Sequence, residues 1–327
     1  MDFGFNSLKM KSLFTQYLKH WILLILMAFF AIAAPGFLSV AGMKNLAVYT
    51  AIPLILALGQ TFVIISGGID LSVGAILGLC GVVSALILKE IWILTESAAL
   101  SISIGMLCGL FFGTMIGVLN GAIIAKLKVP AFVVTLGMLG ICRGATYVLS
   151  SGHSIIQLPP SLGQAGNYQI FGIMPVSVFI AILLALLSYF ILSKTRLGRY
   201  TYSIGGNRQA SLRAGVPVDR YVIKIYALSG FMAAFAGILV LARFATGSPL
   251  AGMNDELDSI AAVVIGGASL FGGVGSISGT VIGALIIGVL LVGLVILNVP
   301  AYWQMIVVGG ILIIAVFIDN MRHRRQS

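Results

Sequence analysis

Charged residues are scarce in this sequence. Only 9% of its 327 residues are Asp, Glu, Lys or Arg, and 60% are hydrophobic. A soluble domain carries about 25% charged residues, so the composition excludes a set of soluble domains and indicates one polytopic, all-α membrane protein. The net charge of +10 would suggest a nucleic-acid partner in a soluble protein. In a membrane protein it is better explained by basic residues retained on the cytoplasmic side, and we expect no nucleic-acid partner.

Cysteine and the common catalytic motifs are equally scarce. Cys80, Cys108 and Cys142 lie far apart in apolar stretches and form no C-x-x-C pair, which argues against a disulfide framework and a metal site. The sequence has no G-x-x-x-x-G-K-[ST], G-x-S-x-G or H-E-x-x-H motif. We therefore expect no ATP bound in the P-loop manner, no catalytic residues and no cofactor or metal in this chain.

Long hydrophobic runs dominate what is present. A membrane-crossing helix needs about 20 apolar residues, and ten such runs are expected at 21–38, 46–66, 70–88, 98–125, 130–150, 173–193, 222–243, 259–273, 277–297 and 301–318. The eighth is short and runs into Gly266 and Gly267, so a re-entrant or broken element is an alternative there. Most Lys and Arg residues fall on one side when both termini are cytoplasmic.

This pattern predicts a simple domain organisation. We expect a cytoplasmic N-terminal segment over residues 1–20, a single transmembrane domain over 21–319 that includes a cytoplasmic loop at 194–221, and a basic cytoplasmic tail over 320–327. Cleavage of a signal peptide after the Ala-Ile-Ala sequence at 31–33 is an alternative. An uncleaved first helix is the simpler interpretation, because many more hydrophobic spans follow.

The stretch from Gln60 to Leu88 contains a carboxylate between two apolar runs. Asp at the centre of a membrane helix costs about 2.5–3.5 kcal/mol. Gly67 and Gly68 can adopt the backbone angles that end a helix, and Asp70 can then cap the next helix. We therefore expect a broken helix here, of the kind that often borders a transport path.

The cytoplasmic loop at 194–221 is basic and contains a short helix signal. Asn207 can cap a helix from Gln209 to Ala214, Gly215 can end it, and Pro217 prevents its return. Such an exposed helix between two spans could dock a soluble partner. An ordinary basic loop held near anionic lipid is the alternative.

Four stretches together resemble one family. They are 59–78 (G-Q-T-F-V-I-I-S-G-G-I-D-L-S-V-G-A-I-L-G), 113–144, 195–216 and 265–283, and the first and third are the most specific. The chain is identified by these motifs as similar to the membrane subunit of bacterial ABC sugar importers of the ribose-type permease family. The resemblance covers most of the chain from about residue 40 to its end.

The resemblance implies a ten-helix, type II importer-like fold, used as a pair in the bacterial inner membrane. The partners would be an identical or related permease subunit, an ABC ATPase that binds ATP and Mg²⁺, and a periplasmic sugar-binding protein. The cytoplasmic loop would carry the coupling helix that enters the ATPase. Its residues would be Asn207, Gln209, Ala210, Ser211, Arg213, Ala214 and Gly215. Ser211, Ala214 and Val216 depart conservatively from the family pattern.

Further polar and glycine residues would form the translocation path or the helix breaks. They are Gly67, Gly68, Asp70, Ser72, Asn120, Arg143, Gly266 and Gly267. Arg143 needs a partner in low dielectric, either Asp70 or carbonyls at a helix break, and structural pairing is favoured over direct contact with sugar. Asn120 is expected to bond between helices.

The function that these expectations favour is passage of a monosaccharide, a ribose-type pentose or a hexose, driven by ATP hydrolysis in a separate subunit. An ABC permease for a branched-chain amino acid or a furanosyl signal molecule is an alternative. An ion-coupled secondary transporter that uses Asp70 as a proton or cation site is a rival of another class.

Overall fold

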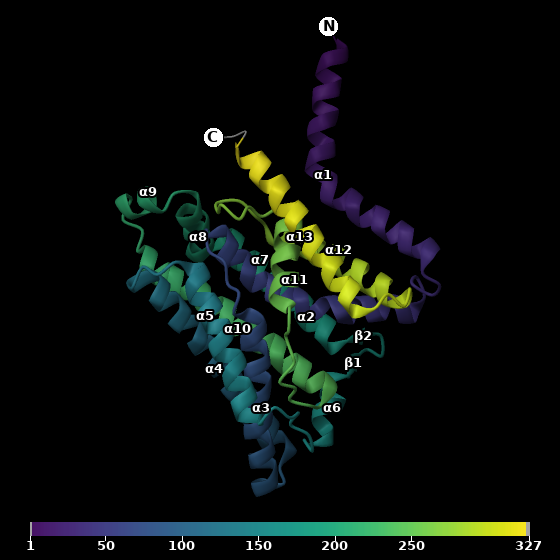
Figure 1. The fold of residues 1–327 in the computed structure, drawn as a ribbon, viewed down its shortest axis with the longest axis vertical. Coiled ribbons are helices and arrows are strands. Elements are labelled where there is room, and N and C mark those ends of the chain that lie inside the picture. Colours follow the sequence, from purple (N-terminus) through teal and green to yellow (C-terminus); the bar gives the residue numbers. More distant parts are fainter. Residues whose placement is uncertain (1, 325–327) are drawn as a thin grey trace.

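The computed structural model describes the backbone of residues 2–324 and the side chains of residues 18–321. This part of the chain is helical apart from one small hairpin (Figure 1). The elements are α1 (Asp2–Ala33), α2 (Val40–Ile65), α3 (Val73–Thr95), α4 (Ala98–Lys126), α5 (Ala131–Ser150), α6 (Pro160–Gly166), β1 (Gln169–Ile170), β2 (Met174–Pro175), α7 (Val176–Lys194), α8 (Arg196–Gly206), α9 (Arg208–Arg213), α10 (Val218–Phe244), α11 (Asp255–Ile265), α12 (Ile277–Ile296) and α13 (Ala301–Arg324).

Eight of the described helices are long and apolar enough to cross a membrane, namely α2, α3, α4, α5, α7, α10, α12 and α13. The segment from Leu18 to Ala33 in α1 is a shorter apolar helix, and α11 occupies the eighth expected span. Every expected span therefore coincides with a helix, although several boundaries differ.

The structure differs from the expectations at three places. Helix α1 begins at Asp2, and its apolar part, Leu18–Ala33, ends before the expected span of 21–38 does. The helix expected to open at Asp70 begins at Val73, with Ser72 as its N-cap residue. The loop at 194–221 contains α8 as well as the short helix, and an amphipathic pattern over Arg196–Gly206 was missed.

The eighth expected span is a broken element. Helix α11 has 11 residues and is about 16 Å long at 1.5 Å per residue. It ends at Ile265, and an irregular segment, 266–276, leads to α12. A helix this short cannot cross a hydrocarbon core about 30 Å thick. The irregular segment 266–276 therefore lies at membrane depth, between α11 and α12.

The outer loop at 151–172 contains α6 and the beginning of a β-hairpin. Strands β1 and β2 pair antiparallel, with Ile170 opposite Met174. Three residues, 171–173, connect the strands, and Phe171 and Gly172 have positive φ angles of 53° and 71° there. Gly247 and Ile155 also exchange backbone hydrogen bonds, which ties this loop to the segment after α10.

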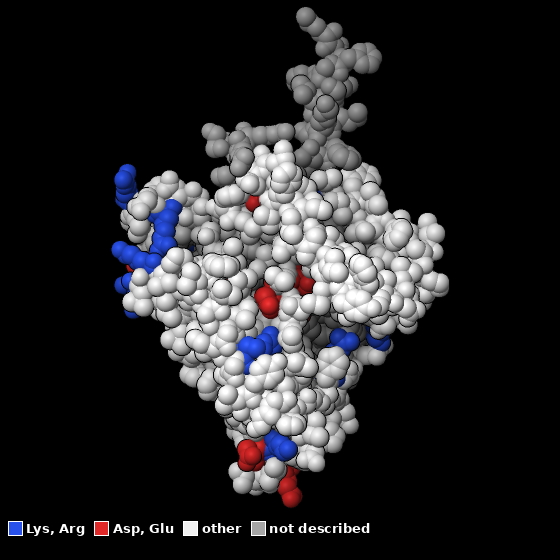
Figure 2. All heavy atoms as spheres, in the orientation of Figure 1, with Lys and Arg blue, Asp and Glu red and all other residues white. Residues whose placement is uncertain are grey.

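Charge is unevenly distributed along the molecule. Figure 2 shows Lys and Arg gathered over α8 and α9 at one end, whereas charges of both signs lie at the tip between α3 and α4. The tip carries Lys89, Glu90 and Glu96. By the positive-inside rule, α8 and α9 face the cytoplasm and the tip faces outward.

The core is built around α2 and α10. Helix α2 is buried continuously from Thr50 to Ile65, so neighbouring helices surround it on all sides. Helix α10 packs along both α4 and α2. Small residues allow the closest of these approaches, because Gly113 and Gly117 of α4 face Gly230 of α10 without side chains between them.

A side chain at Gly117 should force α4 and α10 apart. A Cβ there would overlap the carbonyl oxygen of Tyr226 and lie 3.0 Å from the Cα of Ala227. Overpacking typically costs about 1–3 kcal/mol, so Gly117→Val should lower the unfolding temperature measured in detergent. Gly310→Val is the matched control, because a Cβ at Gly310 meets nothing within 4 Å. Equal unfolding temperatures for the two variants would contradict this packing.

Candidate functional site

The first helix break follows α2. Gly67 adopts a left-handed conformation with φ of 81°. Its N–H donates to the carbonyl of Ile64 at 2.9 Å, and the N–H of Gly68 donates to the carbonyl of Val63 at 3.0 Å. These bonds satisfy carbonyls that the end of a helix leaves free, and a positive φ is where glycine has no steric cost. The expected Gly-Gly break is confirmed, with Gly67 as the residue that turns the chain.

The second break, after α11, repeats this geometry. Gly267 has a φ of 97°. The N–H of Gly267 donates to the carbonyl of Val264 at 2.9 Å, and that of Ala268 donates to Val263 at 3.1 Å. Gly266 keeps helical angles and is the C-cap residue. The two breaks therefore share one turn type and one hydrogen-bond pattern.

The two breaks lie against each other and against α8. The N–H of Gly273 donates to the carbonyl of Ile65 at 2.8 Å. On α8, Gly205 approaches so closely that a Cβ there would overlap the carbonyl oxygen of Ile65. The hydroxyl of Tyr202, also on α8, donates to the carbonyl of Gly275 at 2.8 Å. Movement of α8 must therefore displace both breaks or separate these backbone contacts.

A buried polar network holds the first break. Asp70 is fully buried, and its Oδ1 accepts the N–H of Ser72 at 3.0 Å and the hydroxyl of Ser72 at 2.6 Å. Its Oδ2 accepts the hydroxyl of Ser229 at 2.9 Å. The amide of Asn120 donates to the hydroxyl oxygen of Ser72 at 3.0 Å. Every bond in this set links the break to α4 or α10 or stays within the break.

Side chains from three helices also bond to backbone carbonyls of the break. The amide of Gln60 in α2 donates to the carbonyl of Asp70, and the hydroxyl of Thr135 in α5 donates to the carbonyl of Ile69 at 3.2 Å. The hydroxyl of Tyr226 in α10 also points to this carbonyl, at 3.5 Å. Four helices, α2, α4, α5 and α10, thus supply polar groups to one short segment.

Sequence reasoning found only part of this network. It singled out Asp70, Ser72 and Asn120, which the structure brings together, and missed Gln60 and Ser229. The signal for Gln60 was present, because an amide lies alone within an otherwise apolar run. The signal for Ser229 was weaker, since serine is common in membrane helices as a small packing residue. Asp70 contacts the cap region of α3 as expected, although it lies two residues before the N-cap.

Arg143 holds an outer loop and does not meet Asp70. Its guanidinium donates to the carbonyls of Pro249 at 3.2 Å, Ala251 at 2.9 Å and Gly252 at 3.1 Å. Of the two expected partners, Asp70 is therefore wrong. Backbone carbonyls are the partners, but they belong to the loop between α10 and α11 and not to a helix break. A planar guanidinium with several donors suits three carbonyls better than an ammonium does. Arg143 fixes the segment that leads from α10 into α11.

Acidic residues at the outer start of α11 lie near this guanidinium. Burial raises the pKa of Asp255 to about 7, with Asp258 and Glu256 adding to the increase and Arg143 opposing it. Burial likewise raises the pKa of Asp258 to about 6. Across the described residues there is no group of three or more His, Cys, Asp or Glu side chains arranged to hold a metal ion.

The cytoplasmic helix α9 has the predicted caps. The side-chain oxygen of Asn207 accepts the N–H of Ala210 at 2.9 Å. At the other end Gly215 has a φ of 80°, and the N–H of Val216 donates to the carbonyl of Ser211 at 3.0 Å. The helix runs from Arg208 to Arg213, one residue earlier than expected.

Most of α9 is exposed. Gln209, Ala210 and Arg213 lie on its surface, and Ala214 follows it at the C-cap. Only Ser211 is buried, and its hydroxyl lies 2.7 Å from that of Ser203 on α8. The helix is thus anchored on α8 by the face that carries Ser211, and its other residues are exposed.

A cavity of about 510 Å³ lies between α9 and the first break. Its lining includes Ser66, Gly67, Lys128, Arg208 and Asp219. Arg208 and Asp219 form an ion pair at 3.7 Å in which both side chains are about half exposed. Exposed pairs contribute about 0–1 kcal/mol, so this ion pair holds α9 to α10 only weakly.

The contacts of Arg143 predict a specific effect of its replacement. Arg143→Lys keeps the charge but cannot span three carbonyls. A hydrogen bond to a charged group contributes about 1.5–3 kcal/mol, and every 1.4 kcal/mol is about tenfold in an equilibrium. Amide hydrogen exchange over residues 248–254 should therefore accelerate at least about tenfold, while exchange in α4 stays unchanged. Unchanged exchange in this loop would show that Arg143 does not hold it.

Comparisons with known proteins agree with the resemblance to a permease that the sequence motifs indicated. Residues 42–316 match the family described as "Branched-chain amino acid transport system / permease component". No solved structure matches the chain.

Among curated relatives, the ribose import permease protein RbsC of Escherichia coli K12 is 39% identical over 309 residues, 92% of each chain. The xylose transport system permease protein XylH of Haemophilus influenzae is 35% identical, over 97% of this chain and 100% of its own. The D-allose transport system permease protein AlsC of E. coli K12 is 36% identical, over 94% and 92%. The chain therefore belongs to this family of transport-system permease components, the multi-pass membrane subunits of ABC importers.

Proposed function

We propose that this chain forms the membrane path for a monosaccharide in an ATP-driven importer. The observation that carries the proposal is the pair of helix breaks in contact with α8, which bears the exposed helix α9. Near-full-length similarity to permeases named for ribose, xylose and allose supports the sugar class. A periplasmic binding protein delivers the sugar, and an ABC ATPase in a separate subunit binds ATP and Mg²⁺.

In this mechanism α9 is the coupling helix. The ATPase holds its exposed face, formed by Gln209, Ala210 and Arg213, and pulls or releases it as nucleotide is hydrolysed. Because Ser211 and the glycine contacts of α8 connect α9 to both breaks, the movement reaches the ends of α2 and α11. Reorientation of those ends changes which side of the membrane the path faces.

Asp70, Ser72 and Asn120 act as positioning residues in this account. Asp70 is fully enclosed within this chain and its carboxylate is used for bonds to Ser72 and Ser229. An enclosed carboxylate with these partners supports a fixed break rather than an ion site on the path. This arrangement disfavours the ion-coupled secondary transporter.

The second permease subunit, identical or related, would pack on α5. This helix exposes Gly137, Gly140 and Gly144, and a Cβ at each would meet nothing within 4 Å in this chain. Small residues on an open face allow close approach of another helix. The path would then lie between two such chains. Each chain would have a cytoplasmic N-terminal segment over 1–20, a transmembrane domain over 21–319 and a cytoplasmic tail over 320–327.

Transport in proteoliposomes tests the proposal. The chain, reconstituted with its ATPase and binding protein, should accumulate ribose, xylose or allose only when ATP is supplied. Leucine and a furanosyl signal molecule in the same assay test the alternative substrates. Uptake by the chain alone, driven by an ion gradient, would contradict the proposal.

Replacement of Gly215 tests the coupling role of α9. Gly215→Val should uncouple ATP hydrolysis from transport, because a β-branched residue is strained at a φ of 80°. Gly215→Asn is the matched control, since Asn tolerates this conformation, and it should keep most transport. Normal coupling in the Val variant would remove this helix end from the mechanism.

A further inference from the structure

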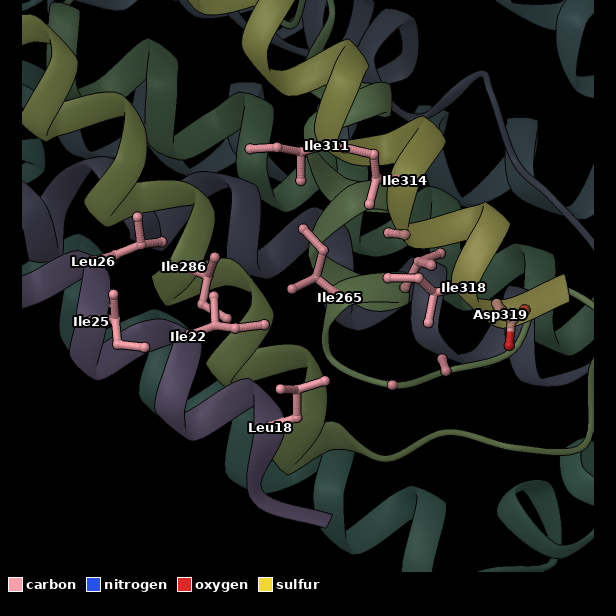
Figure 3. Close-up of a pocket in the computed structure, with 14 residues that line it drawn as sticks. Leu18, Ile22, Ile25, Leu26, Ile265, Ile286, Ile311, Ile314, Ile318 and Asp319 are labelled. Atoms are coloured by element: carbon pink, nitrogen blue, oxygen red, sulfur yellow. The ribbon is translucent and has the colours of Figure 1, made fainter. Parts of the chain in front are cut away.

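An apolar cavity of about 420 Å³ lies between α1 and α13 (Figure 3). None of the residues in the polar network of the first helix break lines it. Its walls are the side chains of Leu18, Ile22, Leu26, Ile286, Ile311 and Ile314, among others, and the one charged residue among its lining is Asp319. Helix α1 packs on α12, and α13 packs mainly on α11. The cavity is thus the space that these two pairs of helices leave between α1 and α13.

The cavity has the depth of one membrane leaflet. Along α1 it extends from Leu18 to Leu26, and along α13 from Asp319 to Ile311. Each stretch covers nine residues, whose eight steps of 1.5 Å give about 12 Å. Half of a hydrocarbon core about 30 Å thick is about 15 Å. Since the charged end faces the cytoplasm by the orientation derived above, the cavity opens in the inner leaflet.

The cavity is too short for a crossing helix. It follows α1 and α13 for about 12 Å, less than half of a hydrocarbon core about 30 Å thick. A flexible hydrocarbon chain is thinner and can follow the irregular wall.

Two opposite charges border the cytoplasmic end. The ammonium of Lys19 donates to the carbonyl of Gly266 at 3.0 Å. The carboxylate of Asp319 accepts the hydroxyl of Ser269 and the N–H of Leu270, each at 3.0 Å. Both charges are therefore attached to the same short segment, 266–270, which also lines the cavity. One cation and one anion held by the same short segment complement a phosphate and an ammonium in one headgroup.

We propose that this cavity binds one acyl chain of a zwitterionic inner-leaflet phospholipid of the phosphatidylethanolamine type. Lys19 faces the lipid phosphate and Asp319 faces its ammonium. Because segment 266–276 also contacts α8 and the end of α2, the lipid supports the second helix break from the membrane side. The site is independent of which solute the chain carries.

Lipid retention tests the assignment. The full-length chain is purified from nanodiscs that contain equal amounts of palmitoyl-oleoyl phosphatidylethanolamine and phosphatidylglycerol, and retained lipid is measured by native mass spectrometry. We expect about one phosphatidylethanolamine per chain. Ala315→Phe should reduce retention about tenfold, because Ala315 lines the cavity. Ile313→Phe is the matched control, since Ile313 is 73% exposed on the same helix outside the lining.

Two variants at the charged residues test recognition of the lipid headgroup separately from filling of the cavity. Lys19→Gln should weaken phosphatidylethanolamine retention, and Asp319→Asn should shift the preference toward phosphatidylglycerol. Equal retention in Ala315→Phe and Ile313→Phe would overturn the proposal. So would a preference for phosphatidylglycerol in the unaltered chain, or a copurifying polypeptide in place of lipid.

Discussion

Irregular backbone within a membrane protein must find hydrogen-bond partners inside the protein, and this constraint governs the structure around residues 66–72. Unsatisfied backbone groups are costly where water is absent. Here the ends of α2 and α11 satisfy their own carbonyls through glycine turns. Polar side chains from α2, α4, α5 and α10 bond to two carbonyls and two side chains of the first break. Because four helices contribute, the break cannot change shape without changing how those helices pack.

Close glycine contacts turn this local arrangement into a connection across the molecule. Gly205 brings α8 against the end of α2, and Gly273 brings the second break to the same carbonyl. No flexible side chain separates these backbones. A movement of α8 should therefore be passed on to the ends of α2 and α11 with little loss. The exposed helix α9, fixed to α8 by Ser211, is therefore joined to two helix ends in the membrane by backbone contacts.

The sequence was sufficient for elements whose signals are local. Ten hydrophobic runs predicted helices at the right places, and eight of those helices are long and apolar enough to cross a membrane. Gly67, Asn207 and Gly215 predicted turns and caps from the conformations that those residue types favour. It was insufficient where the decisive contact is distant in sequence. The partner of Arg143 is a loop more than 100 residues away, and Ser229 reaches Asp70 across 159 positions. The start of α3 was also misplaced, because Asp70 and Ser72 are both good caps and only the surrounding helices decide between them.

The central claim is that α9 and the second break move as one body during the ATP cycle. Pulsed electron paramagnetic resonance can measure it directly in the assembled importer, with spin labels at Gln209 and Phe271 and a second pair at Gln209 and Val148 on α5. Cys108, the one described cysteine that is not buried, would first be replaced by Ser. The account predicts that ATP leaves the Gln209–Phe271 distance unchanged while the Gln209–Val148 distance changes. A change in the Gln209–Phe271 distance as large as that in the second pair would contradict it.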